Sequence, residues 1–95
     1  MATLKTLGEA EIERELAAVP GWTRDGDAIV ETVQLSDFDE AMSFANLVAQ
    51  TANELDHHPT ITIDWKNVTL RTSSHDAGGL TERDFALARA IDGLI

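Results

Sequence analysis

The sequence predicts one α+β domain over residues 1–95, with the element order α-β-β-α-β-β-α. The expected architecture is a four-stranded antiparallel sheet with three helices packed on one face. Two observations support it. Three segments repeat apolar residues with the period of a helix, and between them lie two pairs of short segments that alternate with the period of a strand. Each pair is joined by a short turn and is therefore expected to form a hairpin.

The first helix is expected from about Gly8 to Val19. Its apolar residues recur at the spacing of one helix face, at Ile12, Leu16 and Val19. Thr6 and Glu9 have the spacing of a capping box, in which two side chains satisfy free N–H groups at a helix start. Pro20-Gly21 is a helix stop signal, so the helix ends there.

A hairpin over residues 22–35 and a second helix are expected next. Asp25-Gly26-Asp27 is the turn signal of the hairpin, whose second strand has Ile29, Val33 and Leu35 on one face. Ser36 has the position of an N-cap for the second helix. Pro59 limits the length of this helix, because the residue before a proline avoids helical geometry. The predicted inward stripe consists of Phe38, Met42, Ala45, Val48, Ala49, Ala52 and Leu55.

The second hairpin and the last helix complete the fold. Residues 60–65 and 68–73 alternate cleanly, and Lys66-Asn67 between them has the length of a two-residue hairpin loop. Thr81 begins the last helix, and Asp84 has the position of a capping-box acid, a role that is sufficient to explain it. The expected inward residues of this helix are Phe85, Ala88, Ile91 and Leu94 or Ile95.

The loop at Lys66-Asn67 sets a register that gathers the histidines. It pairs Trp65 with Val68, Ile63 with Leu70 and Ile61 with Thr72, and it places Trp65 on the apolar face as a core residue. Extended further, it sets His58 opposite His75, with Cβ atoms within about 5.5 Å. The three histidines would then lie at one end of the sheet beside Glu54, Asp56 and Asp76.

Such a cluster favours acid–base chemistry. Histidine titrates near neutral pH, so imidazoles in different surroundings can supply an acid and a base together. Ser73 and Ser74 add hydroxyls, and the nearby carboxylates could orient an imidazole or bind a donor-rich ligand. A metal is not expected, because the adjacent His57 and His58 project differently and no common ligand spacing is present. Three solvated histidines that cluster by accident remain an alternative.

Composition excludes several classes of protein. The chain has no cysteine, so disulfide scaffolds and thiolate sites are excluded. A net charge of −10 argues against nucleic acid and anionic membranes as partners. No apolar run approaches the ~18 residues of a membrane span. The N-terminus lacks the apolar segment of a signal peptide, and a cytoplasmic location is expected.

Several motifs together resemble the pterin-4a-carbinolamine dehydratase family. They are Glu54-Leu55-Asp56-His57-His58-Pro59, then Trp65, then the run Ser73-Ser74-His75-Asp76-Ala77-Gly78-Gly79-Leu80-Thr81-Glu82-Arg83-Asp84. The family pattern is an acidic residue before His-His-Pro, an aromatic residue six or seven later, a second histidine segment, and an Asp opening the last helix. With Pro20-Gly21-Trp22, the resemblance covers nearly the whole chain.

The resemblance implies a lyase that needs neither metal nor cofactor. Its reaction converts 4a-hydroxytetrahydropterin to quinonoid dihydropterin and water, in tetrahydrobiopterin recycling, and its members are homodimers or homotetramers. The implied catalytic residues are His57, His58 and His75. The implied substrate-binding residues are Glu54, Asp56, His57, His58, Pro59, Ser73, Ser74, His75 and Asp76, with Asp84 as a further candidate. Our hypothesis is that His57 and His75 share the acid and base roles while His58 binds and polarises the ring.

Three alternatives remain open from the sequence. The first is a non-catalytic dimerisation or assembly partner with the same fold. The second is an enzyme acting on a molybdopterin-related pterin, although such a ligand is anionic and little positive charge is available beyond Arg71. The third is a histidine metal site.

Overall fold

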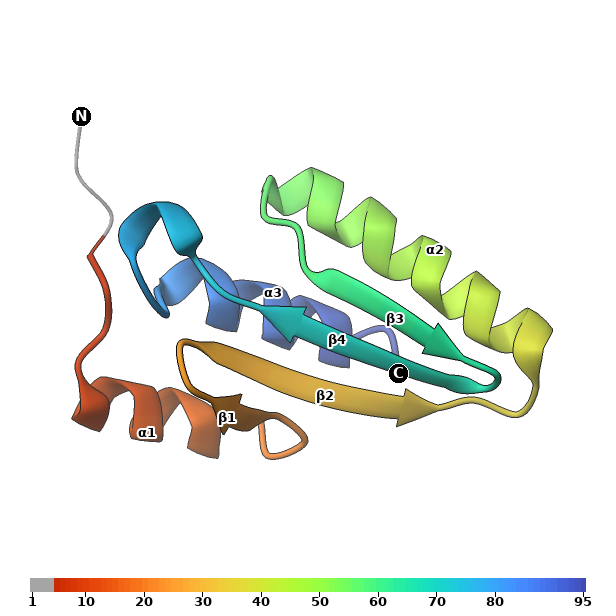
Figure 1. Ribbon diagram of the computed structural model, residues 1–95, viewed down its shortest axis with the longest axis horizontal. Coiled ribbons are helices and arrows are strands. Elements are labelled where there is room, and N and C mark those ends of the chain that lie inside the picture. Colours follow the sequence, from red (N-terminus) through yellow and green to blue (C-terminus); the bar gives the residue numbers. More distant parts are fainter. Residues whose placement is uncertain (1–4) are drawn as a thin grey trace.

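The computed structural model describes residues 5–95 and has the predicted order of helices and strands (Figure 1). The elements are α1 (Glu9–Ala17), β1 (Thr23–Asp25), β2 (Ala28–Gln34), α2 (Phe38–Leu55), β3 (Thr60–Asp64), β4 (Asn67–Thr72), the 3₁₀ turn η1 (His75–Ala77) and α3 (Glu82–Asp92). The expected absence of a signal peptide concerns an N-terminus whose first four residues lie outside the described part. No helix within residues 5–95 is long and apolar enough to cross a membrane.

The four strands form one antiparallel sheet in the order β1-β2-β4-β3. Figure 1 shows α3 behind the sheet, α2 along the β3 side and α1 next to β1. Buried residues of all three helices, including Ile12, Val48 and Phe85, join Ile29 and Leu70 of the sheet in one core. The other face of the sheet carries polar residues, so the predicted α+β arrangement is confirmed.

The buried face of α2 matches the predicted stripe only in part. Phe38 is 51 % exposed, and Met42 and Leu55 are also exposed. The buried residues of the helix are Ala41, Phe44, Ala45, Val48 and Ala52. Ala45, Val48 and Ala52 are therefore buried as predicted, and Ala41 and Phe44 are the buried residues that were not predicted. The alanines on this face let the helix approach its neighbours closely.

Two of the three predicted helix starts are shifted. In α1 the N-cap is Gly8, whose N–H donates to Glu11 Oε1 at 3.1 Å, so the predicted Thr6–Glu9 box is wrong. In α2 the cap is Asp37 rather than Ser36, because the Asp37 carboxylate accepts from the N–H of Glu40 at 2.8 Å. Each shift moves the start of the helix by only one or two residues, which leaves the fold unchanged.

The register of the β3–β4 hairpin is shifted by two residues from the prediction. Ile63 pairs with Val68 and Ile61 with Leu70, so the two-residue loop is Trp65-Lys66. An even shift keeps every side chain on its predicted face, so the apolar alternation could not distinguish the two registers. Trp65 occupies the loop with φ 51° and is 63 % exposed, so its predicted core position is wrong. The direct pairing of His58 with His75 is also lost.

Candidate active site

The end of α2 turns the two adjacent histidines in different directions. Asp56 caps the helix in the left-handed conformation, at φ 51° and ψ 42°. The next N–H, that of His57, still donates to the Ala52 carbonyl at 3.1 Å. The chain therefore reverses sharply before the extended segment that Pro59 imposes. As a result His57 is directed inward and is 8 % exposed, whereas His58 is exposed.

A buried carboxylate at the start of α3 receives the inward histidine. Asp84 is fully buried, and its Oδ1 lies 2.6 Å from His57 Nε2. The same oxygen accepts from the Thr72 hydroxyl at 2.7 Å. Its Oδ2 accepts from the Ser74 hydroxyl at 2.8 Å and from the Thr81 N–H at 3.0 Å. We call these five residues the Asp84 network.

The other donors in the Asp84 network favour His57 as a donor to Asp84. The hydroxyls of Thr72 and Ser74 each donate their one hydrogen to Asp84, and Thr81 donates its backbone N–H to the same carboxylate. The Thr81 hydroxyl lies 2.7 Å from the Ser74 oxygen, to which it can therefore donate. With three donors directed at it, the carboxylate is expected to accept from His57 as well. Nε2 then carries a proton, and in the neutral ring Nδ1 holds the lone pair.

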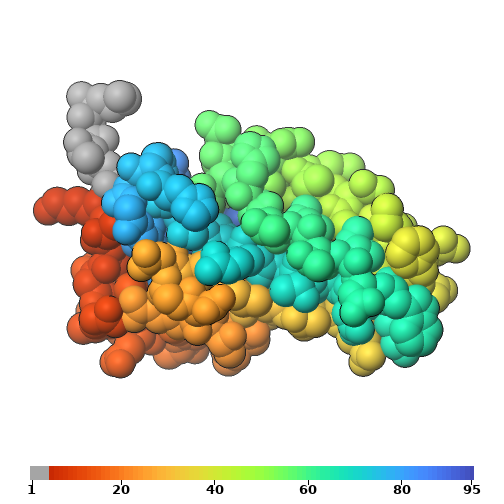
Figure 2. Space-filling model, in the orientation of Figure 1, coloured from red at the N-terminus to blue at the C-terminus, as the bar shows by residue number. Residues whose placement is uncertain are grey.

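The Asp84 network also brings the second histidine segment to this end of the molecule. Ser74 is buried and bonded to Asp84, and the next residue is His75 at the start of η1. Gly78, at φ 83°, closes this short turn, and Ser74 bridges to Gly79. Figure 2 shows the blue surface of this loop beside the green surface at the end of α2. A shared carboxylate therefore joins the two segments, in place of the predicted strand pairing.

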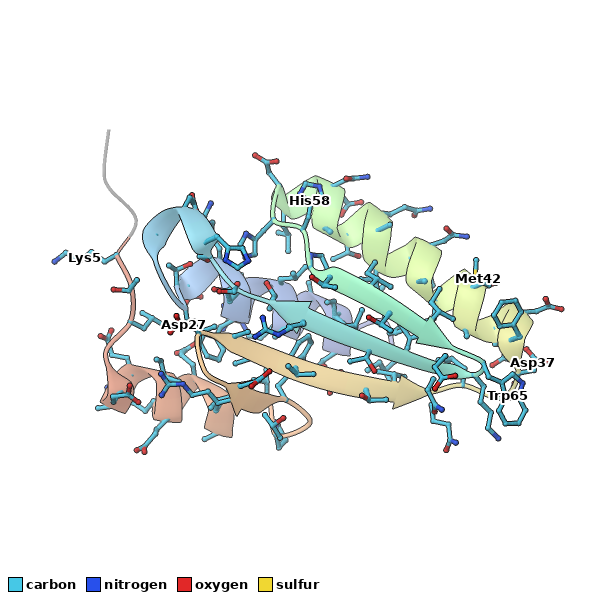
Figure 3. The ribbon with its side chains drawn as sticks, viewed as in Figure 1. Lys5, Asp27, Asp37, Met42, His58 and Trp65 are labelled. Atoms are coloured by element: carbon cyan, nitrogen blue, oxygen red, sulfur yellow. The ribbon has the colours of Figure 1, made fainter. Side chains whose placement is uncertain are left out.

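The exposed histidines lie on an open surface. Figure 3 places His58 at the end of α2, where its Nε2 lies 2.9 Å from Asn53 Oδ1. His75 is exposed as well. Within residues 5–95 no enclosed pocket is present. Asp84 contacts Nε2 of His57 and Asn53 contacts Nε2 of His58, so neither of these two nitrogens has the predicted Glu54 or Asp56 as its partner.

The remaining predicted site residues have varied surroundings. The Ser73 hydroxyl donates to the Asp27 carbonyl at 2.6 Å and so ties β4 to the first hairpin. Asp76 is exposed and pairs with Arg83 at 2.6 Å; this hydrogen bond holds the pKa of Asp76 below its usual value. Glu54 is exposed and Pro59 is partly buried. Ser73 and Asp76 thus already have partners, whereas Glu54 is open to a ligand.

Three residues of this region were not predicted from the sequence. Thr72 and Thr81 belong to the Asp84 network, and Asn53 contacts His58. Thr72 could have been found from the sequence. It follows Val68 and Leu70 on the inward face of β4, and a hydroxyl buried there needs a hydrogen-bond partner. Asp84 was expected to act as a helix cap. It does so, and its carboxylate also accepts from the hydroxyls of Thr72 and Ser74 and contacts Nε2 of His57.

Comparison with known proteins gives concordant matches over nearly the whole chain. The family described as pterin 4 alpha carbinolamine dehydratase matches residues 5–94. A protein of Thermomicrobium roseum named "Putative pterin-4-alpha-carbinolamine dehydratase" is 51 % identical over 85 residues, covering 90 % of this chain and 91 % of that protein. A protein of the same name from Nocardia farcinica is 46 % identical over 92 residues, covering 97 % of each.

Two solved structures share the fold. A transcriptional coactivator/pterin dehydratase from Brucella melitensis superposes with a TM-score of 0.90 at 30 % identity, covering 95 % of this chain and 98 % of that one. A pterin dehydratase-like protein described as a RuBisCO assembly factor in the alpha-carboxysome has a TM-score of 0.62 at 18 % identity, covering 77 % and 84 %. The second likeness concerns the fold alone.

Proposed function

Because the chain belongs to the pterin-4a-carbinolamine dehydratase family, we propose that it dehydrates 4a-hydroxytetrahydropterin by histidine acid–base catalysis. The products are quinonoid dihydropterin and water, and we expect the reaction to serve tetrahydropterin recycling in the cytoplasm. The observation that carries the proposal is the fixed His57–Asp84 pair, which the Asp84 network links to the segment of His75.

The reaction needs one proton delivered and one removed. The C4a hydroxyl leaves as water after it gains a proton, and the N5–H proton is lost as the C4a–N5 double bond forms. We assign these two transfers to His57 and His75, and we assign binding and polarisation of the ring to His58. Positioned acid–base groups contribute about 10²–10⁴-fold to a rate, which suits a reaction that already proceeds slowly unaided.

The surroundings of His57 support its part in this scheme. Its Nε2 is committed to Asp84, so only Nδ1 can exchange a proton with a ligand. A buried carboxylate that accepts from one ring nitrogen stabilises the imidazolium formed when the other nitrogen takes a proton. His58 and His75 are exposed, so their rings are accessible to a flat heterocycle at the surface.

Charge supports a neutral substrate over a molybdopterin-related, anionic one. Arg71 is paired with Asp25 at 3.4 Å, and Arg83 is paired with Asp76. Neither cation is left without a carboxylate partner, which disfavours the binding of phosphate. A pterin ring instead presents an amino group, and the exposed carboxylates of Glu54 and Asp56 are suitable acceptors for it.

Substitution of the histidines tests the assignment. His57→Gln retains a side-chain N–H for Asp84 but has no titratable group, so it separates loss of chemistry from loss of structure. His75→Ala removes an exposed ring at little expected cost in stability. We expect each variant to lower kcat for freshly generated carbinolamine about 10²-fold or more. Gln50→Ala, exposed on α2, serves as the control and should keep the full rate.

The three histidines should differ in their kinetic effects. His58→Ala is expected to raise KM more than it lowers kcat, because its assigned role is mainly binding. Unchanged kcat in both His57→Gln and His75→Ala would contradict the acid–base assignment. If only His58→Ala lowered kcat, the proton transfers would have to be assigned to His58 instead.

Exposed apolar residues support association with a further chain, which we propose is a second copy. Phe38 and Met42 on α2 and Trp65 in the β3–β4 loop are exposed. Figure 3 shows Met42 and Trp65 away from His58. Light scattering should therefore give the mass of a dimer or tetramer, and Met42→Glu should reduce it. A monomer at micromolar concentration would contradict this, and capture of a different protein would favour an assembly role.

A further inference from the structure

We infer that Thr72 is a positioning residue for His57, acting through Asp84; this inference rests on the proposed function. Thr72 is the last residue of β4, and only 1 % of it is exposed. Its hydroxyl donates to Asp84 Oδ1, the oxygen that also faces His57 Nε2. The sheet thereby holds the acceptor of the histidine that we assign to proton transfer.

The two oxygens of Asp84 are held by different parts of the fold. Oδ2 is fixed by Ser74 and by the Thr81 N–H, which form the cap of α3 and the loop before it. Oδ1 has only two donors within the described residues, His57 and Thr72. Without Thr72, the orientation of Oδ1 would depend on the very ring that it is meant to orient.

The position of Thr72 is itself firmly determined. Its backbone is paired with Ile29 in the centre of the sheet, on the side of β4 away from β3. A β-branched side chain has restricted rotation about χ1, so the direction of its hydroxyl follows from the strand. Because 2.7 Å is a normal length for a hydroxyl–carboxylate hydrogen bond, this contact transmits the position of β4 to the carboxylate.

The chain offers matched variants for a test. Thr72→Val keeps the shape and removes the hydroxyl, whereas Thr72→Ser keeps the hydroxyl. Thr69→Val makes the same chemical change on the same strand but on the open face, where Thr69 bonds only Thr32 at 2.9 Å. All variants are to be studied in the full chain by dehydration kinetics and by ¹H–¹⁵N NMR of the His57 ring. Thr72→Ala replaces Thr72→Val should the latter not fold.

We expect Thr72→Val to lower kcat about tenfold with KM within about twofold, and to shift the Nε2–H signal of His57. Thr72→Ser should restore both within about twofold, and Thr69→Val should match wild type. In a His57→Gln background, Thr72→Val should cause no further loss of kcat. Unchanged kcat and unchanged ring signals in Thr72→Val would overturn the inference, as would equal losses in Thr69→Val.

The NMR measurement separates this inference from the proposed function. If wild-type protein does not accelerate dehydration, the proposed function fails, while the ring signals of His57 still show whether Thr72 positions it. Altered signals would then uphold the positioning contact for a different reaction. Unaltered signals would reject it regardless of the substrate.

Discussion

A buried carboxyl group next to a second, partly buried one makes the stability of the protein depend on pH. Glu31 lies on the core side of β2, is 8 % exposed, and its Oε1 has no hydrogen-bond partner within residues 5–95. Burial raises the pKa of Glu31 to about 7, and the negative charge of Asp92 and a hydrogen bond to it add to the shift. Gly21 makes room for this arrangement, because a Cβ there would lie 2.2 Å from Glu31 Oε2.

The direction of the effect follows from proton binding. In the unfolded chain the pKa of Glu31 is near the ordinary 4.5, while in the folded protein it is about 7. Between these values the folded state holds a proton that the unfolded state has lost, so the free energy of unfolding falls as pH rises. The contribution of protonated Glu31 to the free energy of unfolding is complete below about pH 4.5 and is lost above about pH 7. Allowing for solvent screening, its size is roughly 1–3 kcal/mol.

Glu31→Gln should remove this dependence. Glutamine has the same shape, stays neutral and can still donate a hydrogen bond to Asp92. We expect the variant to exceed wild type in free energy of unfolding by roughly 1–3 kcal/mol at pH 8, and to differ little from it at pH 4.5. Urea titrations at pH 4.5, 6, 7 and 8 measure this, with the exposed Glu13→Gln as control. An unchanged pH slope, or lower stability of Glu31→Gln at pH 8, would refute the reasoning.

Two further substitutions test the cap of α2 and the core. Asp56→Gly should raise the free energy of unfolding by about 1 kcal/mol in urea titrations, because glycine adopts the left-handed conformation without strain and removes an acid from a helix C-terminus. It should also raise KM, while Asp56→Ala should give no gain in stability; equal stability of the Gly and Ala variants would contradict the argument. Phe85→Ala should cost about 3–5 kcal/mol, since Phe85 is fully buried, and a loss below about 1 kcal/mol would place the core elsewhere.

The fold was predictable because the apolar periods of the sequence agree with its turn signals. The capping box of Thr81 and Asp84 was recognised from spacing alone and is confirmed. The faces of β3 and β4 were also correct, since Ile61 and Ile63 contact the core as their alternation requires. Local rules failed where two solutions satisfy the same pattern. The two registers of the β3–β4 hairpin are such a case.

The site was harder to predict, because its geometry depends on contacts between distant segments. The sequence predicted that strand pairing brings the three histidines together. In the structure Asp84 instead connects His57 to Ser74, the residue before His75, and no local pattern could link Asp84 to His57, 27 residues away. A polar residue in an apolar alternation, as at Thr72, was the available signal for such a network.

We propose that this protein accelerates the loss of water from the C4a position of a hydroxylated tetrahydropterin. The most direct measurement is the initial rate of quinonoid dihydropterin formation from freshly prepared carbinolamine, with and without the purified wild-type chain. We predict a rate that rises in proportion to protein concentration and exceeds the spontaneous one by at least about 10²-fold at saturation. A rate equal to that in buffer alone would contradict the proposed dehydratase activity.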